Sequence, residues 1–339
     1  MTDIPPVARR QVVLPVETYV DGVTGGDRAM LARAITLIES TNPEHEAIAQ
    51  QVLLALLPRT GHSVRIGISG VPGAGKSTFI ETFGRMVLDK GHRVAVLAVD
   101  PTSPRTGGSV LGDKTRMTYL SQDVRAFIRP SPTAGTLGGV ARRTREAMLL
   151  CEAAGFDVVI IETVGVGQSE ATVSRMVDFF LVLLLASGGD ELQGIKRGIL
   201  ELADLVAVNK CDVESPAVVN RAMADFGHAM RILRGVDAGD ASRVVRCSGL
   251  TGEGLDAIWN RISPLLVAAD QGGALAERRA RQNVEWLWTT AESALLSALH
   301  DSAEVQGIRA ELEADVRAGR TTPTLAARRM LEAYVSGRI

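Results

Sequence analysis

The sequence of 339 residues contains only three cysteines, Cys151, Cys211 and Cys247, and they show no C-x-x-C spacing. Cysteines that are few, odd in number and far apart argue against a disulfide framework and against a cysteine metal site. The five histidines also lack the spacing of metal ligands. We therefore expect a reducing, cytoplasmic compartment.

An excess of charge of one sign is lacking as well. Lys and Arg number 37, and Asp and Glu number 39, so that the formal net charge is −2. A protein that binds nucleic acid or a membrane surface usually shows a basic excess. We therefore expect no nucleic acid and no membrane among the partners, which leaves proteins and small molecules.

Long apolar runs are missing too. A membrane-spanning helix needs about 20 apolar residues, whereas the longest run here, FFLVLLLA at 179–186, is typical of a strand buried on both faces. The N-terminal segment has no apolar core of the signal-peptide kind, and its acidic residues and prolines argue against a transit helix. The chain is therefore expected to carry no membrane or targeting segment.

The stretch VRIGISGVPGAGKST at 64–78 is the feature around which the rest is organised. An apolar run that predicts a strand ends in GVPGAGKS at 70–77, which satisfies the phosphate-loop pattern G-x-x-x-x-G-K-[ST]. A helical pattern follows from Ser77 to Lys90. Because a phosphate loop lies between a strand and a helix, this context disfavours the alternative of a glycine-rich turn that binds nothing.

The residues of this loop suit a nucleotide triphosphate. Gly70, Gly73 and Gly75 allow backbone N–H groups to turn inward around phosphate oxygens, and the positive end of the helix dipole adds to the attraction. Lys76 is expected to reach the β- and γ-phosphates, and the Ser77 hydroxyl to ligate the Mg²⁺ that bridges them.

A second motif, Asn209-Lys210-Cys211-Asp212, follows the predicted strand 205–208 and matches N-K-x-D. Asp212 can accept hydrogen bonds from the N1–H and amino groups of guanine, which adenine does not offer, while the Lys210 stem packs against the base. Ser248-Gly249-Leu250 lies one strand–helix unit downstream, where a second base contact is expected. The alternative is a polar turn after a strand, but beside a phosphate loop the motif favours GTP or GDP.

Three carboxylates are candidates for the Mg²⁺ site or the attacking water. Glu162 ends the apolar run 158–161, Asp100 ends the run 93–99, and Asp113 lies in the long stretch rich in glycine, serine and proline that follows. A connection of that length indicates a switching loop, although Asp113 is equally suited to cap a helix from Lys114.

Hydrolysis without a partner is expected to be slow. Val166 stands where many GTPases carry the glutamine that orients water, and Gln168 lies two residues further on. In the glycine-containing segment 187–198, Lys196 can supply positive charge to the transition state when a partner positions it, or can simply face water. Lys76, Asp100, Glu162 and Lys196 are therefore the candidate catalytic residues.

From residue 64 to 268, short apolar runs alternate with amphipathic helical patterns, which favours an α/β fold with a mostly parallel sheet and helices on both faces. Ligands of such sheets gather at the carboxyl ends of the strands. We expect an N-terminal helical extension over 1–62, a nucleotide domain over 63–270 and a C-terminal helical arm over 271–339.

The two extensions show different patterns. Residues 1–25 show no clear pattern, and N-terminal helices are expected after Asp27 and Asn42. In the arm, apolar residues at helical spacing, among them Trp288, are interpreted as core. An arm this short has little interior of its own, so we expect it to pack on the main domain or on a second copy.

Six stretches in this order closely resemble the MeaB/ArgK family over roughly residues 26–300: GVPGAGKST, AVDPTSPRTGGSVLGDKTRM, FIRPSPTAGTLGGVARRTRE, ETVGVGQSE, GGDELQGIKRGILELAD and NKCD. The resemblance implies a P-loop GTPase that binds methylmalonyl-CoA mutase or a related adenosylcobalamin-dependent acyl-CoA mutase. It further implies that the chain gates cofactor delivery, protects the mutase and forms a homodimer through its C-terminal arm. The sequence shows no D-x-H-x-x-G motif, so cobalamin is expected on the partner.

The resemblance also implies roles for particular residues. It gives the segment 187–198 as a further switch that responds to the mutase. By position it gives a phosphate cradle at Gly73, Ala74, Gly75, Lys76, Ser77 and Thr78, Ser77 as a Mg²⁺ ligand, metal or switch carboxylates at Asp100, Asp113 and Glu162, and a guanine site at Asn209, Lys210, Asp212, Ser248, Gly249 and Leu250.

Three alternative functions remain at this point. A kinase linked to basic amino-acid transport would transfer phosphate to a protein or metabolite. A nickel or cobalt insertase of the same fold needs metal-capturing His or Cys clusters, which the sequence lacks. A non-hydrolysing scaffold would need nucleotide only for folding.

Overall fold

The computed structural model describes residues 13–99, 117–130, 137–163, 169–187, 197–234, 243–271 and 273–337. The chain forms two compact units, of which unit 1 ends at Arg279 and unit 2 begins at Ala280. Among the described residues, no helix has the length and apolar character that crossing a membrane requires.

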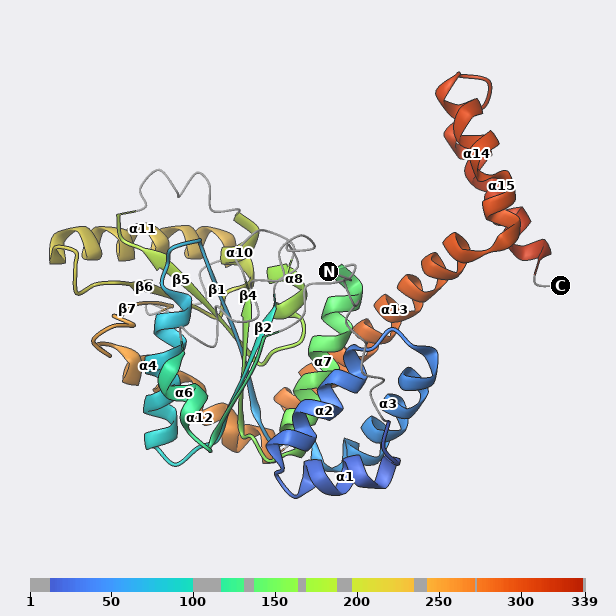
Figure 1. Cartoon of the computed structure of the whole chain (residues 1–339). Helices are drawn as coiled ribbons and strands as arrows, with labels where there is room; N and C mark the ends of the chain where they lie inside the picture. Colours follow the sequence, from blue (N-terminus) through green and yellow to red (C-terminus); the bar gives the residue numbers. More distant parts are fainter. Residues whose placement is uncertain are drawn as a thin grey trace, which may run out of the picture. The chain divides into compact units, whose positions relative to one another are not determined.

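A seven-stranded sheet of order β3-β2-β4-β1-β5-β6-β7 forms the centre of unit 1 (Figure 1). All of its pairings are parallel. The central strands are buried along nearly their whole length, as expected when helices cover both faces of a parallel sheet. The predicted α/β fold is therefore confirmed. The strands are β1 (Val64–Gly70), β2 (Val94–Val99), β3 (Ala126–Pro130), β4 (Val158–Thr163), β5 (Phe179–Leu185), β6 (Leu205–Asn209) and β7 (Val244–Arg246).

Helices cover both faces of this sheet. On one face, α4 (Lys76–Asp89), α6 (Thr118–Gln122) and α12 (Leu255–Gln271) pack on alternate side chains of β1 in a single apolar cluster. On the other face lie α7 (Leu137–Ala153) and α8 (Ser169–Ser174), and α8 approaches β1 so closely that a Cβ on Gly67 would lie 3.0 Å from Val173. The helices α10 (Arg197–Leu202) and α11 (Pro216–Arg234) pack against β5 and β6 respectively.

Three N-terminal helices, α1 (Val16–Thr24), α2 (Arg28–Glu39) and α3 (Pro43–Leu56), pack against α7, and a 3-10 turn at Leu57–Arg59 follows. The expected helix starts are confirmed: Asp27 accepts a hydrogen bond from Ala29 N at 2.8 Å, and Asn42 accepts one from Glu44 N at 2.9 Å.

Two sequence-based expectations about unit 1 were wrong. Residues 1–25 show no clear sequence pattern, so that no helix is expected there. Helix α1 forms nevertheless, because Tyr19 and Val23 are buried against its neighbouring helices. The apolar run at 124–128 predicts a strand there, whereas strand β3 begins two residues later, at Ala126. Asp123 accepts a hydrogen bond from Arg125 N at 2.8 Å, so that a local turn delays the strand.

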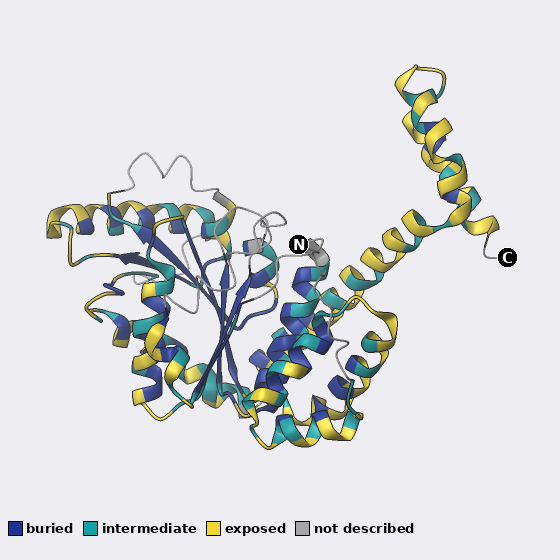
Figure 2. Ribbon diagram, viewed as in Figure 1, coloured by how far each residue is buried: buried dark blue, intermediate teal, exposed yellow. Residues whose placement is uncertain are grey.

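Unit 2 contains most of α13 (Ala274–Asp301) together with α14 (Ala303–Arg317) and α15 (Pro323–Ser336). The helices α14 and α15 pack against each other, and each carries buried apolar residues, Val305 and Leu312 on α14 and Ala326 on α15. Figure 2 shows that most of this unit is exposed. Trp288 is 64% exposed, so its interpretation as core is wrong for the single chain. Helical spacing identifies an apolar stripe but not what covers it.

Candidate functional site

The predicted phosphate loop connects the carboxyl end of β1 to the first turn of α4 (Figure 1). Gly73 and Gly75 have φ values of 81° and 85°, in the left-handed region that favours glycine. A Cβ on Gly70 would lie 2.3 Å from the carbonyl oxygen of Leu183 on β5, so only glycine fits there. The N-cap of α4 is Gly75, which has no side chain to bond the N–H groups of the first turn. The loop therefore leaves the positive end of α4 open to an anion.

Lys76 bends back over this loop. Its Nζ donates to the carbonyl oxygens of Gly70 at 2.9 Å and Val71 at 3.3 Å. Burial lowers the pKa of Lys76, while the charges of Glu162 and Glu170 act to raise it. The ammonium group thus lies next to the glycine loop, where it can bind phosphate oxygens.

Ser77 and Glu162 meet beside the same loop. The Ser77 hydroxyl donates to Glu162 Oε1 at 3.3 Å, and Glu162 is buried because β4 pairs with β1 in the register Ile68↔Glu162. A hydroxyl and a carboxylate are hard oxygen ligands of the kind that Mg²⁺ prefers. Within the part of the chain that the structure describes, no cluster of three or more His, Cys, Asp or Glu side chains is placed to hold a metal. The pair fits a Mg²⁺ ion whose other ligands are phosphates and water.

Asn209 joins the glycine loop to the second predicted motif. This side chain is buried at the end of β6, where Nδ2 donates to the carbonyl oxygen of Ala74 at 2.7 Å and Oδ1 accepts from Gly249 N at 2.8 Å. The next residue, Lys210, has a left-handed φ of 62°, and its Cε would lie 3.5 Å from a Cβ on Gly75. One amide therefore fixes the two loops side by side, with the Lys210 stem next to the glycine loop.

The loop after β7 rests directly on α4. A Cβ on Gly249 would lie 2.8 Å from the Cα of Phe79, and Thr82 Oγ1 donates to the Gly249 carbonyl oxygen at 2.5 Å. Within the loop, the buried Ser248 hydroxyl accepts from Leu250 N at 3.2 Å and Thr251 N at 3.0 Å. This arrangement leaves Leu250 exposed at the surface.

The structure thus brings together most of the predicted site residues. One continuous edge of the sheet carries the glycine loop with Lys76, Ser77 and the exposed Thr78, the carboxylate Glu162, and the pair Asn209 and Gly249. Asp212 lies exposed three residues beyond the end of β6. The remaining predicted residues, Asp100, Asp113, Val166, Gln168 and Lys196, lie outside the described residues.

Sequence reasoning missed two supporting residues. Thr163 donates through Oγ1 to Ser69 Oγ at 2.8 Å, which links β4 to β1 just below the glycine loop. Thr82 holds the loop after β7. Thr82 belongs to no motif, and Thr163 lies within the stretch ETVGVGQSE without a role that the sequence indicates, because each acts on a residue far away in the sequence.

Known proteins resemble this chain over most of its length. Residues 31–304 match the family model described as methylmalonyl Co-A mutase-associated GTPase MeaB. A putative GTPase of Caulobacter vibrioides is 53% identical over 95% of this chain and 98% of its own length. GTPase ArgK of Escherichia coli is 51% identical over 81% of this chain and 83% of its own length. The mitochondrial methylmalonic aciduria type A homolog of Mus musculus is 45% identical over 95% of this chain and 80% of its own length.

A solved structure also matches this chain over most of its length. The crystal structure of an LAO/AO transport system kinase superposes with a TM-score of 0.74 and 38% identity, over 95% of this chain and 98% of that one. Both the family model and these relatives cover the glycine loop, the N-K-x-D motif and the loop after β7. The chain therefore belongs to the MeaB family of GTPases.

Proposed function

We propose that this GTPase times the loading of adenosylcobalamin into an acyl-CoA mutase, methylmalonyl-CoA mutase or a relative, and protects that mutase. The observation that carries the proposal is the pair of hydrogen bonds of Asn209, because they hold the two predicted nucleotide motifs side by side. The family description supplies the kind of partner, a methylmalonyl-CoA mutase.

In this proposal the first turn of α4 and the glycine loop bind the phosphates of GTP. Backbone N–H groups from Gly73 to Thr78 surround the phosphate oxygens. Lys76 turns from the carbonyl oxygens of Gly70 and Val71 to the β- and γ-phosphates. Because Lys76 is half-buried, its charge is less screened than that of a surface lysine.

Ser77 and Glu162 would hold Mg²⁺, which when bound neutralises charge that develops on the β- and γ-phosphates. The hydroxyl would be a direct ligand, and the carboxylate would hold the ion or its water. Asp100 and Asp113 remain proposed as further metal or switch carboxylates. Lys196 remains proposed as a cation that the mutase moves into place.

Guanine selection is proposed for Asp212 with Lys210 and the loop Ser248–Leu250. The exposed carboxylate of Asp212 is open to a base, and the Lys210 stem lies along the glycine loop. Adenine cannot give Asp212 the two donors that guanine offers, so that bound ATP would leave a desolvated carboxylate without partners.

The C-terminal arm, proposed to span residues 271–339, is proposed as the dimer interface. In unit 2 the apolar residues Val284, Leu287, Trp288 and Leu295 are each more than half exposed along α13. Monomeric proteins rarely expose apolar patches of this kind. A second copy of the chain is the occupant that the family resemblance supplies. For the compartment we propose the cytoplasm, with the three cysteines as free thiols.

The proposal is tested with purified chain and purified apo-mutase. We expect slow release of phosphate from GTP by the chain alone, faster release when the mutase is added, and GTP-dependent transfer of adenosylcobalamin into the mutase. Lys76→Ala should remove both GTP effects. Cofactor loading at the same rate with wild-type chain, with Lys76→Ala and with no chain at all would overturn the chaperone role.

One alternative keeps support from the comparisons, because the superposed crystal structure is named a transport system kinase. GTP labelled in the γ-phosphate separates the two activities. Label recovered as inorganic phosphate supports the GTPase chaperone. Label recovered on a protein or on a basic amino acid supports the kinase.

A further inference from the structure

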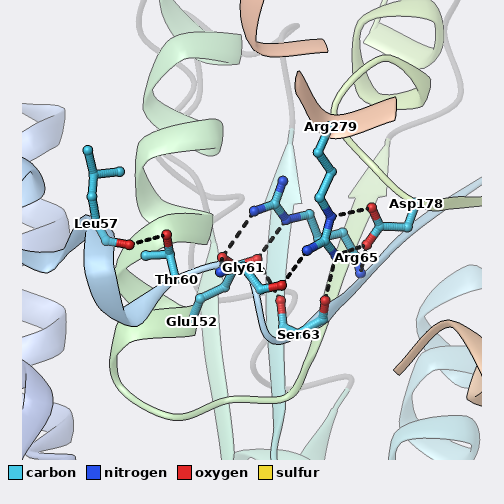
Figure 3. A network of polar contacts seen from close by, with 8 residues as sticks. All are labelled: Leu57, Thr60, Gly61, Ser63, Arg65, Glu152, Asp178 and Arg279. Atoms are coloured by element: carbon cyan, nitrogen blue, oxygen red, sulfur yellow. Dashed lines mark hydrogen bonds and ion pairs between the residues drawn. The ribbon is translucent and has the colours of Figure 1, made fainter. Parts of the chain in front are cut away.

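A buried network of ion pairs lies at the end of the sheet opposite to the nucleotide site. Figure 3 shows its four charged residues, Arg65 at the start of β1, Glu152 on α7, Asp178 just before β5, and Arg279 on α13. All four belong to unit 1, and all four are buried. The nucleotide site does not use them.

The first half of the network joins β1 to α7. Arg65 donates to both oxygens of Glu152, through Nε at 2.6 Å and Nη2 at 3.0 Å. Glu152 also accepts from Ser63 Oγ at 2.5 Å and from Gly61 N at 2.8 Å. Burial acts to raise the pKa of Glu152, but the charge of Arg65 and these hydrogen bonds outweigh it and lower the pKa. Glu152 is therefore a charged partner of Arg65.

The second half joins β1 and β5 to α13. Asp178 accepts from Arg65 N at 2.8 Å, and from Arg279 through Nε at 2.9 Å and Nη2 at 2.5 Å. Arg279 further donates to the carbonyl oxygens of Gly61 at 2.5 Å and Ser63 at 2.6 Å. The planar fork of Arg279 thus meets four acceptor atoms from two segments, the loop before β1 and Asp178, an arrangement that lysine cannot reproduce.

The strands that begin at this network end at the nucleotide site. Strand β1 runs from the Arg65 region to the glycine loop at Gly70, a distance of about 17 Å at about 3.3 Å per residue. Strand β5 begins next to Asp178 and ends at Leu185. Helix α13 continues past Arg279, the last residue of unit 1, into unit 2.

We infer that Arg279 is a positioning residue that couples the association state of the C-terminal arm to nucleotide binding through β1 and β5. The network suits this role because both partners are buried: if Arg279 withdraws, the buried Asp178 carboxylate loses both hydrogen bonds from the guanidinium, which is costly. The inference rests on the proposed dimer. Linkage then requires that a GTP analogue and arm association change each other's affinity by the same factor.

The experiment measures the dimer dissociation constant of the full chain by sedimentation, with GDP and with a non-hydrolysable GTP analogue, both with Mg²⁺. We expect the two constants of the wild-type chain to differ by at least about fivefold, the lower end of typical allosteric factors. Arg279→Gln should bring the ratio close to one, and Arg279→Lys, which keeps the charge without the fork, should give an intermediate ratio. Arg281→Gln is the matched control, because Arg281 is exposed two residues further along α13, and it should keep the wild-type ratio.

Each other outcome has one meaning. A wild-type dimer with equal constants overturns the coupling and leaves the proposed function in place. A chain that is monomeric at every concentration overturns the proposed dimer and the coupling with it. A wild-type ratio in Arg279→Gln, accompanied by a lower unfolding temperature, shows that the network is merely structural. If Arg279→Gln does not fold, Arg279→Lys decides, and a wild-type ratio in that variant overturns the inference.

Discussion

Replacing Asn209 by alanine tests whether one amide holds the nucleotide site together. The substitution removes the donor to the Ala74 carbonyl oxygen and the acceptor for Gly249 N. Both backbone groups belong to buried residues. In the nucleotide-free chain the two loops are then free to separate and reach water, and binding of GDP must bring them back together.

The structure sets the size of the effect. A buried hydrogen-bonding group left without a partner costs about 1–3 kcal/mol, so two such groups cost about 2–6 kcal/mol when neither finds water. Relaxation of the loops reduces this cost, and about 1.4 kcal/mol corresponds to a factor of ten in affinity. If about two thirds of the cost, about 1.3–4 kcal/mol, appears on binding, the affinity for GDP falls by about 10- to 1000-fold.

The assay is a calorimetric titration of GDP with Mg²⁺, combined with urea unfolding of the nucleotide-free chain. Asn220→Ala on α11 is the matched control, because Asn220 is an exposed asparagine, and it should bind GDP like the wild type. A GDP affinity of Asn209→Ala within twofold of the wild type would refute the reasoning. Lower stability with unchanged affinity would make Asn209 a purely structural residue.

Two further predictions concern other parts of the chain. Glu152 has a folded-state pKa below its unfolded value of about 4.3, so its ion pair stabilises the fold fully above that pH and stops doing so as the pH falls through the folded pKa. Glu152→Gln should therefore lower the free energy of unfolding at neutral pH by about 3–5 kcal/mol, the cost of breaking a buried pair. It should also flatten the pH dependence of this free energy below about pH 4.3, which urea unfolding across that range measures. Parallel pH profiles for variant and wild type would contradict this prediction. Trp288→Glu should weaken dimer association at least tenfold in sedimentation, because Trp288 is exposed on the proposed interface. Arg309→Gln, which removes only an exposed ion pair with Glu313 on α14, should not weaken it. Equal dimer dissociation constants for Trp288→Glu and wild type would contradict the assignment of the arm as the interface.

The sequence predicted the parts of the molecule that depend on local pattern. The glycine loop, its strand and its helix lie within residues 64–89, and the helix caps Asp27 and Asn42 directly precede their helices. Asn209 was predicted from the N-K-x-D motif, and Glu162 as the carboxylate that ends an apolar run. Both lie at the same edge of the sheet because parallel strands end there.

Features that depend on tertiary packing could not be predicted in this way. Helix α1 has β-branched residues and a glycine that lower its helix propensity, and burial of Tyr19 and Val23 overrides that preference. Arg279 binds Asp178, 101 residues earlier in the sequence, with no local signal at either position. Helical spacing places Trp288 on an apolar stripe of α13 but does not tell whether another surface covers that stripe, so its exposure could not be predicted.

We propose that the glycine loop and Asp212 form one site for a guanine nucleotide. The most direct measurement is a competition calorimetry experiment, in which GDP, GTP and ATP are titrated with Mg²⁺ into wild-type chain and into Asp212→Asn. We expect binding heat with GDP and GTP, none with ATP at the same concentrations, and a weaker, less selective response in Asp212→Asn. Wild-type chain that gives no heat with GTP or GDP, or an Asp212→Asn variant with an unchanged preference for GTP over ATP, would contradict it.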